Sequence, residues 1–303
     1  MEDLPQVLGV RGLLDRLTCD ISEWIEQSSS ELQEMLRWQL LADSKYFRPM
    51  TIFAAHFAMS DAAPPPRVLR SAVALELFHN VSLIIDDILD RSRHRRGKPT
   101  LHCRFGNLPA LMASGYITAA GFKMVAKDPF SVRLLADLLQ RLGIAECLQW
   151  RLRREPLGVE DWRAVAGEDT GSMFETCAVL GTRNEHLRRF GRLLGMLYHG
   201  CDDVADIRGT VALGGGGNED LRDGILTLPA AIAIADPETA VLFRNARAQT
   251  VGRLTERVAG ALPDAEEHLD KLADEARREA EQCAVHPEPL FHLIRFTRAL
   301  SRT

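Results

Sequence analysis

The chain has 303 residues, of which 46% are hydrophobic and 26% are charged, and its 42 acidic and 37 basic side chains give a formal net charge of −5. This composition is typical of a globular protein and excludes a disordered or collagen-like chain. Because no run of five like charges occurs, the sequence predicts no nucleic-acid partner and no polybasic membrane surface.

Targeting and membrane signals are missing from the sequence. Glu2 and Asp3 stand where a secretory signal peptide needs positive charge, and no apolar run approaches the roughly 18 residues of a membrane span. The six cysteines are scattered without a C-x-x-C pair, which favours reduced thiols over a disulfide framework or a zinc finger. We therefore expect a cytoplasmic protein with no integral membrane segment.

Apolar residues recur at spacings of three and four along most of the chain, and alternating apolar and polar runs are missing. This period predicts an all-α fold, and because no shift in composition separates two regions, it predicts a single helical domain over residues 1–303. The helix over 68–91 follows a break at Pro64 to Pro66 and is apolar on most faces, so we expect it in the centre of the fold. Further helices are predicted over 109–126, 130–148, 160–181 and 185–208.

The second half of the chain contains the longest predicted loop, at Gly214 to Gly217. These glycines are not followed by Gly-Lys-Ser/Thr and do not follow a strand pattern, so the sequence does not indicate a phosphate-binding P-loop. From about Leu228 the apolar period predicts four amphipathic helices. Their expected breaks lie near Asp236-Pro237, Pro263 and His286-Pro287.

Three aspartates, Asp86, Asp87 and Asp90, end the most apolar predicted helix. At about 100° per residue, Asp86 and Asp90 share one helix face and Asp87 lies on its shoulder. Like charges in an apolar setting are costly and raise one another's pKa values. A hard cation relieves this repulsion, because Mg²⁺ takes a few carboxylate oxygens and completes its shell with water and substrate phosphate oxygens.

The same spacing recurs at Asp202, Asp203 and Asp206, again within an apolar helical segment. A single cluster of this kind is often a solvated helix face, but two clusters with identical spacing and apolar flanks favour a shared chemical role. Mg²⁺ held by such clusters neutralises a leaving diphosphate, and an apolar pocket protects the carbocation that remains. The sequence therefore predicts an enzyme that acts on a diphosphate ester.

Further motifs, in their order along the chain, resemble those of the trans-isoprenyl diphosphate synthases, the polyprenyl synthetase family. The resemblance runs from about Lys45 to Pro229. The motifs that carry it are Lys45-Tyr46-Phe47-Arg48-Pro49 (K-x-x-R-P), His79 seven residues before Asp86, Arg95 to His102 (R-R-G-x-P-T-L-H), Asp220-Leu221 (D-L) and Thr227-Leu228-Pro229 (T-L-P).

The resemblance implies a large helical bundle of the isoprenoid synthase type with a central cavity. It also implies condensation of an allylic diphosphate with isopentenyl diphosphate, and a homodimer with its contact around residues 109–126. The six aspartates of the two clusters are then the catalytic residues and the ligands of up to three Mg²⁺ ions, with Mn²⁺ as an alternative. Isopentenyl diphosphate is expected to bind Lys45, Arg48, His79 and Arg96, and the allylic diphosphate to bind Arg95.

The chain departs from the family pattern on the allylic side, because no lysine occurs between Lys127 and Lys271. Glu175-Thr176 is read in place of the family's lysine and threonine, and Tyr198-His199 in place of its Phe-Gln. Thr176 and His199 are still expected to bind substrate, whereas Glu175 is expected to repel the leaving diphosphate. The arginines considered as compensating cations are Arg163, Arg183 and Arg208.

Two other functions stay open at this point. A class I terpene cyclase on the same scaffold would use both aspartate clusters without isopentenyl diphosphate. The lost lysines favour that alternative, whereas the retained Lys45, Arg48 and His79 argue against it. A non-catalytic subunit of a heteromeric prenyl synthase is the second alternative, and two complete aspartate clusters argue against it.

Product length is predicted from the residues before the first cluster. Val81 and Ser82 are too small to close a pocket for the hydrocarbon tail, whereas Phe78, eight residues before Asp86, is the first large ring on that face. Two helical turns are about 11–12 Å, which predicts a product of about C15–C20. The alternative interpretation is that Phe78 belongs to the packed core.

Overall fold

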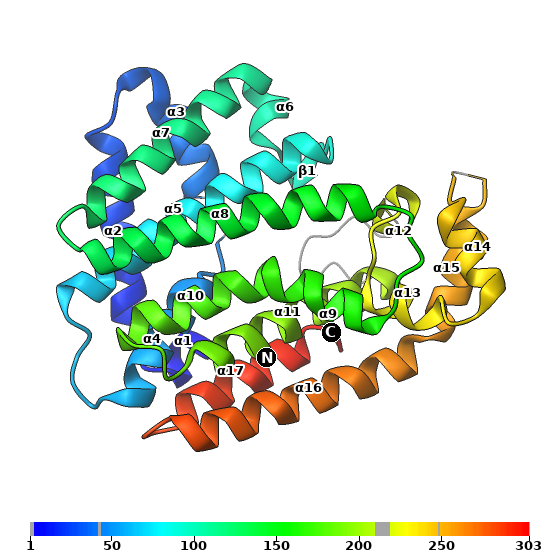
Figure 1. Cartoon of the computed structure of the whole chain (residues 1–303). Coiled ribbons are helices and arrows are strands. Elements are labelled where there is room, and N and C mark those ends of the chain that lie inside the picture. The colour runs from blue at the N-terminus through cyan, green and yellow to red at the C-terminus, as the bar shows by residue number, and fades with distance from the viewer. Residues whose placement is uncertain (1–2, 42–43, 210–218, 248, 303) are drawn as a thin grey trace. The chain divides into compact units, whose positions relative to one another are not determined.

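The computed structural model describes residues 3–41, 44–209, 219–247 and 249–302. In this part of the chain, 17 helices and one short hairpin confirm the predicted all-α fold (Figure 1). The contacts divide the chain into two compact units, which we call unit 1 (Met1–Ala136 and Cys177–Asn184) and unit 2 (Asp137–Thr176 and Glu185–Thr303). The single domain and the central cavity stay predictions.

Unit 1 is built around α5 (Pro66–Leu89), which packs against α7 (Asn107–Val125) and α4 (Phe47–Met59). Pro66 is a good first residue for this helix, because its missing N–H would have no partner there and its φ is already helical. Most faces of α5 are buried, as expected for the most apolar helix. The other helices of unit 1 are α1 (Leu4–Val7), α2 (Arg11–Glu26), α3 (Ser30–Leu40) and α6 (Leu101–Phe105).

A hairpin with strands of two residues each follows α5 and contains two of the predicted diphosphate-binding arginines. Its strands, β1 (His94–Arg95) and β2 (Lys98–Pro99), pair antiparallel. Arg96 and Gly97 form the turn with φ values of 52° and 74°. Two successive left-handed residues define a type I′ turn, which glycine adopts freely and arginine adopts at some cost. Backbone strain of this kind is concentrated at functional sites in proteins.

Unit 2 is organised by α11 (Arg188–Arg208), which packs against α9 (Val159–Glu168) and α16 (Leu262–Cys283). A Cβ on Gly195 would lie 2.7 Å from the Thr170 carbonyl oxygen, so only glycine allows α11 to approach the chain there so closely. The other helices with residues in unit 2 are α8 (Pro129–Leu152), α10 (Thr170–Thr182), α12 (Glu219–Asp223), α13 (Leu228–Ala233), α14 (Pro237–Arg244), α15 (Val251–Gly260) and α17 (Glu288–Ala299).

The predicted helix boundaries need two corrections. The single helix expected over 160–181 is two helices, α9 and α10, because the chain breaks at Asp169, where ψ is −99°. After Leu228 the described part of the chain has five helices instead of four, since an additional break lies between α14 and α15. The loop predicted at Gly214 to Gly217 lies outside the described residues.

Helix α5 is long and apolar enough to cross a membrane by length and composition alone. In the structure, 72% of its most apolar window is buried inside the protein. The central helix of a globular fold has the same length and composition.

Replacing Asp128 by asparagine is expected to lower the free energy of unfolding at pH 7 by about 2 kcal/mol. Arg183 donates to both carboxylate oxygens at 2.8 Å, and this contact holds the pKa of Asp128 at about 2, below its usual 3.8. Because the folded pKa is the lower one, the stabilisation is present above about pH 4 and disappears as the pH falls towards 2. Urea unfolding at pH 7 and pH 3 measures this, and a difference between the two proteins that does not shrink at pH 3 contradicts it.

Candidate active site

The first aspartate cluster lies at the end of α5, and its three carboxylates differ in their surroundings. Asp87 is 2% exposed, and its Oδ1 accepts hydrogen bonds from Arg95, with Nε and Nη2 both at 2.9 Å. Burial raises the pKa of Asp87, and Arg95 opposes that shift. Asp86 is half-buried and Asp90 is exposed. Asp87 is therefore held inside the protein, whereas its two neighbours reach the helix surface.

Contacts link basic residues in three separate segments of unit 1. Arg48 on α4 donates from Nη1 to Nε2 of His79 on α5 at 3.0 Å. Arg96 in the hairpin donates to Oγ of Ser44, which precedes the exposed Lys45. Burial, then Arg48, lower the pKa of His79 well below its usual value, so the ring is neutral. Its Nδ1 has no hydrogen-bond partner among the described residues.

Glu76 lies one helical turn from His79 on α5 and was not singled out in the sequence. The side chain is 3% exposed, and Asn80 donates to its backbone carbonyl at 2.9 Å and to its Oε1 at 3.4 Å. Burial raises the pKa of Glu76, while Arg48 and Arg96 lower it. A carboxyl group in an apolar helix three residues before His79 is the signal that could have identified it.

The second aspartate cluster lies on α11, and again its middle aspartate is buried while the other two are more accessible. Asp203 is 7% exposed, and its Oδ2 accepts from the Trp162 indole N–H and from the Leu228 backbone N–H, both at 2.8 Å. Burial raises the pKa of Asp203, and His199 opposes the shift most strongly. Asp202 and Asp206 are half-buried. Direct coordination of a metal by Asp87 and Asp203, as expected from their spacing, does not fit carboxylates enclosed by protein donors.

His199 connects this cluster to the break between α9 and α10. Its Nδ1 is 2.9 Å from Thr170 Oγ1 and 3.4 Å from Asp169 Oδ2, and its Nε2 is 3.8 Å from Asp203 Oδ1. Burial lowers the pKa of His199, but Asp203 and Asp169 outweigh it and raise the pKa to about 9. Both ring nitrogens face protein groups, so the predicted substrate contact by His199 does not fit its position.

The structure also corrects the assignment of Glu175-Thr176. Thr176 is 3% exposed, and its hydroxyl donates to the Ser172 carbonyl at 2.9 Å, so the predicted substrate contact by Thr176 does not fit either. The threonine that lies beside the second cluster is Thr170, preceded by Asp169. The signal for it was available, because an acidic residue followed by threonine occurs twice before the cluster.

Glu175 lies within a group of arginines. Arg141 donates to its two oxygens at 2.9 and 3.3 Å, Arg188 donates to Oε1, and Arg192 approaches Oε2 at 3.6 Å. The Glu175 side chain is 6% exposed. The carboxylate expected to repel the leaving diphosphate is instead the buried partner of three guanidinium groups.

Each arginine considered as a compensating cation is paired with a carboxylate of its own. Arg163 approaches Glu275 at 3.2 Å, and Arg208 approaches Glu266 at 2.6 Å. Arg183 forms the pair with Asp128 described above. These contacts pair each arginine with a carboxylate of the protein and do not support the prediction that the arginines replace the missing lysines.

The three residues predicted to set product length lie on α5, four to eight residues before Asp86 of the first cluster. Phe78 is fully buried, with its ring centroid 5.0 Å from that of Phe122, and a Cβ on Gly121 would lie 2.9 Å from its ring. Val81 is 5% exposed, and Ser82 is half-buried and donates to the His79 carbonyl at 2.8 Å. Phe78 is thus packed against α7, which is the arrangement that the alternative interpretation described.

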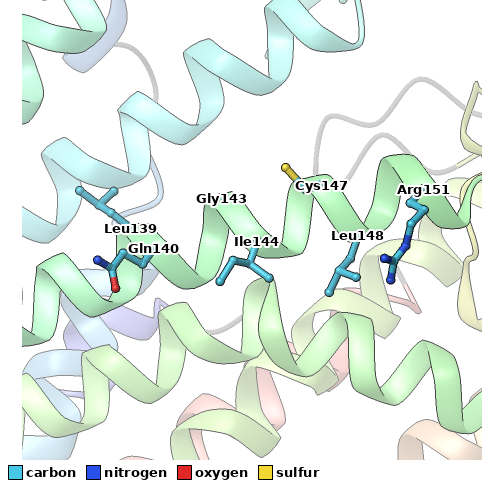
Figure 2. Close-up of a pocket in the computed structure, with 7 residues that line it drawn as sticks. All are labelled: Leu139, Gln140, Gly143, Ile144, Cys147, Leu148 and Arg151. Carbon is cyan, nitrogen blue, oxygen red and sulfur yellow. The ribbon is translucent and has the colours of Figure 1, made fainter.

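An apolar hollow of about 580 Å³ runs along one side of α8. Its lining repeats at helical spacing and ends in the single cation Arg151, as Figure 2 shows. The lining residues are Leu139, Gln140, Gly143, Ile144, Cys147, Leu148 and Arg151.

The described residues contain no group of three or more His, Cys, Asp or Glu side chains arranged to hold a metal ion. The accessible aspartates nevertheless offer hard oxygen ligands in pairs four residues apart, Asp86 with Asp90 and Asp202 with Asp206. Mg²⁺ is bound through one or two carboxylates together with water and substrate phosphates, and not by a dedicated protein cage. The donor chemistry of these pairs therefore fits Mg²⁺.

The chain is similar in sequence to a known protein family and to several of its members. The family model described as polyprenyl synthetase matches residues 29–259. Geranylgeranyl pyrophosphate synthase 4 of Arabidopsis thaliana is 28% identical over 252 residues, which are 75% of this chain and 67% of the relative. Nonaprenyl diphosphate synthase of Mycobacterium tuberculosis is 28% identical over 225 residues, which are 70% of this chain and 66% of the relative.

Solved structures show the same fold. A polyprenyl synthase from Caulobacter crescentus, complexed with calcium and isoprenyl diphosphate, has a TM-score of 0.87 at 23% identity and is covered to 98%, as is this chain. Heptaprenyl diphosphate synthase from Staphylococcus aureus has a TM-score of 0.87 at 19% identity, covering 96% of this chain and 98% of that one. The likeness confirms the predicted all-α isoprenoid synthase fold.

Proposed function

The chain belongs to the polyprenyl synthetase family and is a trans-prenyltransferase, and from this premise we propose that it condenses an allylic diphosphate with isopentenyl diphosphate. The observation that carries the proposal is the contact of Arg48 with His79, at 3.0 Å, on the helix that ends in the first aspartate cluster. A cyclase needs no second diphosphate site of this kind.

In the proposed reaction, the bond between C1 and oxygen of the allylic diphosphate breaks, and diphosphate leaves with the electron pair. C1 of the resulting cation then bonds to C4 of isopentenyl diphosphate. Loss of a proton from C2 of the isopentenyl unit gives the trans product, with the released diphosphate as the base. The reaction requires no histidine or glutamate as catalytic base.

Lys45, Arg48, His79 and Arg96 are the proposed ligands of isopentenyl diphosphate. Guanidinium forks suit phosphate oxygens, and lysine adds a compact charge. Because Nε2 of His79 accepts from Arg48, its proton lies on Nδ1, and this N–H is the donor left for a phosphate oxygen. Arg95 is the proposed ligand of the allylic diphosphate beside Asp87, although it is paired with that carboxylate here.

Mg²⁺, when bound, supplies the positive charge that stabilises the leaving diphosphate. The residues that would hold it are the accessible members of each cluster, Asp86 and Asp90 in unit 1 and Asp202 and Asp206 in unit 2. We assign Asp87 and Asp203 as internal anchors of the two clusters, because protein donors enclose them. Up to three Mg²⁺ ions, with Mn²⁺ as an alternative, stay the prediction.

We assign the hollow along α8 to the hydrocarbon tail of the substrate. A prenyl diphosphate is apolar along its length and anionic at one end. The hollow has matching chemistry, with Leu139, Ile144 and Leu148 along it and Arg151 at its end.

The ring of phenylalanine in place of Ser82 is expected to shorten the main product, because Ser82 is half-buried one turn before Asp86. Phe78→Ala should lengthen the product if its ring closes the pocket, but it also removes a buried ring and costs about 3–5 kcal/mol of stability. Mass spectrometry of the products measures the change in product length for each variant. An unchanged product distribution from a folded Ser82→Phe protein contradicts the prediction that this face of α5 limits the length of the tail.

We also propose that the chain forms a homodimer through α7. Leu108, Leu111 and Met112 are 68%, 45% and 60% exposed on one face of this helix. Contiguous apolar side chains on a surface are typical of an interface. Light scattering at micromolar concentration should give twice the monomer mass, and Met112→Lys should lower it to the monomer mass. A monomer mass for the unmodified chain overturns this proposal.

The cytoplasmic location stays a prediction.

Product identification distinguishes the proposed function from its alternatives. The purified chain is incubated with Mg²⁺ and allylic diphosphates of five to twenty carbons, with and without isopentenyl diphosphate. A synthase gives a longer diphosphate only when isopentenyl diphosphate is present. A cyclase gives a hydrocarbon or alcohol without it, and a non-catalytic subunit gives neither product.

A further inference from the structure

Two carboxylates and one imidazole of unit 2 form a connected series at the second aspartate cluster. Asp169 and Thr170 contact one nitrogen of His199, and the other nitrogen faces Asp203. Asp203 in turn accepts from Trp162 on α9 and from Leu228 at the start of α13. The series therefore ties the break before α10 to α9, α11 and α13.

We infer that Asp169 and His199 are positioning residues that hold the buried carboxylate of Asp203, and so keep Asp202 and Asp206 available on the accessible face of α11. The inference rests on the proposed function, because it takes those two aspartates as the residues that would hold Mg²⁺. Groups that hydrogen-bond to the ligands of a metal commonly change metal affinity about 10-fold to 100-fold when removed. Asp169 and His199 act one step further out, through Asp203, so we expect an effect at the lower end of that range.

The physical reason lies in the burial of Asp203. Its Oδ2 receives two hydrogen bonds, whereas the group nearest its Oδ1 among these contacts is Nε2 of His199 at 3.8 Å. Without that ring, the Oδ1 of a 7% exposed carboxylate loses this neighbour, and its burial then favours rotation of the carboxylate towards the solvent side of the helix. There it would compete with Asp202 and Asp206 for the same ion.

A second histidine provides a matched control. Trp162 contacts the rings of both His199 and His268 edge to face, with centroid distances of 6.1 and 5.9 Å. His268 approaches Arg163 and has no contact with either aspartate cluster among the described residues. If His199 only fills space beside Trp162, then replacing either histidine by glutamine should have similar effects.

The experiment compares His199→Gln with His268→Gln in the full chain. The first readout uses metal-free protein labelled with ¹⁵N at tryptophan, and the Trp162 indole N–H resonance is assigned with Trp162→Phe. Both changes alter the ring contacts, but only His199→Gln should weaken the hydrogen bond to Asp203 and shift the indole proton upfield. An indole proton that moves equally in the two variants overturns the inference.

The second readout is the Mg²⁺ concentration that gives half-maximal turnover. We expect His199→Gln to raise it about 10-fold, and His268→Gln to leave it within about two-fold. A value within two-fold for His199→Gln overturns the inference. If the unmodified chain shows no condensation, the proposed function fails, and the indole resonance of the metal-free protein still decides whether His199 holds Asp203.

Asp169→Asn keeps the inference testable if His199→Gln does not fold. Because Asp169 acts through His199, Asp169→Asn alone should raise the Mg²⁺ requirement, and the double variant should be no worse than the poorer single one. Effects that multiply in the double variant show independent roles and contradict the series.

Discussion

Asp86→Asn and Asp202→Asn are each expected to lower the Mg²⁺-dependent condensation rate by at least about 10²–10³-fold, the cost of removing one group that stabilises developing charge. Both side chains are half-buried at the surface of their helices, so their loss should change the melting temperature little. Steady-state turnover and thermal unfolding of the purified proteins measure the two effects separately.

Asp87→Asn is the matched control for Asp86→Asn, since the two residues are neighbours on α5. Asp87 is 2% exposed and carries the contact with Arg95, so its replacement should lower stability as well as activity. A folded Asp86→Asn protein with near-normal turnover would show that this carboxylate does not hold the metal.

Glu175→Lys is expected to reduce the free energy of unfolding by about 3–5 kcal/mol, the usual cost of breaking a buried ion pair. The change removes the partner of Arg141, Arg188 and Arg192 and places a fourth cation among them. Sequence alone suggested a faster reaction, because a lysine there would have aided the leaving group. Denaturant unfolding of the variant measures the loss of stability, and its turnover tests the expected gain in rate.

Glu185→Lys is the control for that experiment. Glu185 also pairs with Arg188, but its side chain is 62% exposed, and an exposed pair contributes less than about 1 kcal/mol. A Glu175→Lys protein that is as stable as the unmodified chain and turns over faster would contradict a structural role for the arginine group around Glu175. It would instead support the prediction that Glu175 repels the leaving diphosphate.

The regular apolar period made most of the fold predictable. The helices at the two clusters, α5 and α11, lie within two residues of the predicted 68–91 and within three of the predicted 185–208. The break at Asp169 was missed although the sequence carried a signal for it, because residues 167–172 contain no apolar side chain and include Gly167 and Gly171 beside the N-cap types Asp169 and Thr170. That break places Asp169 and Thr170 at the second cluster.

Spacing predicted which residues cluster but not what each one does. Helix geometry separated the middle aspartate of the first cluster from the other two, but the sequence assigned all three the same role. Only the hairpin that brings Arg95 and the helix that brings Trp162 give Asp87 and Asp203 protein donors of their own. Glu175 shows the same limit. Its arginine partners come from α8 and α11, and no local pattern links them to it.

The most direct test of the proposed condensation measures diphosphate released by the purified chain with Mg²⁺ and an allylic diphosphate, while the consumption of isopentenyl diphosphate is followed in the same sample. The proposed function predicts one diphosphate released for each isopentenyl diphosphate consumed, and almost none when isopentenyl diphosphate is omitted. Release at the same rate without isopentenyl diphosphate would contradict it.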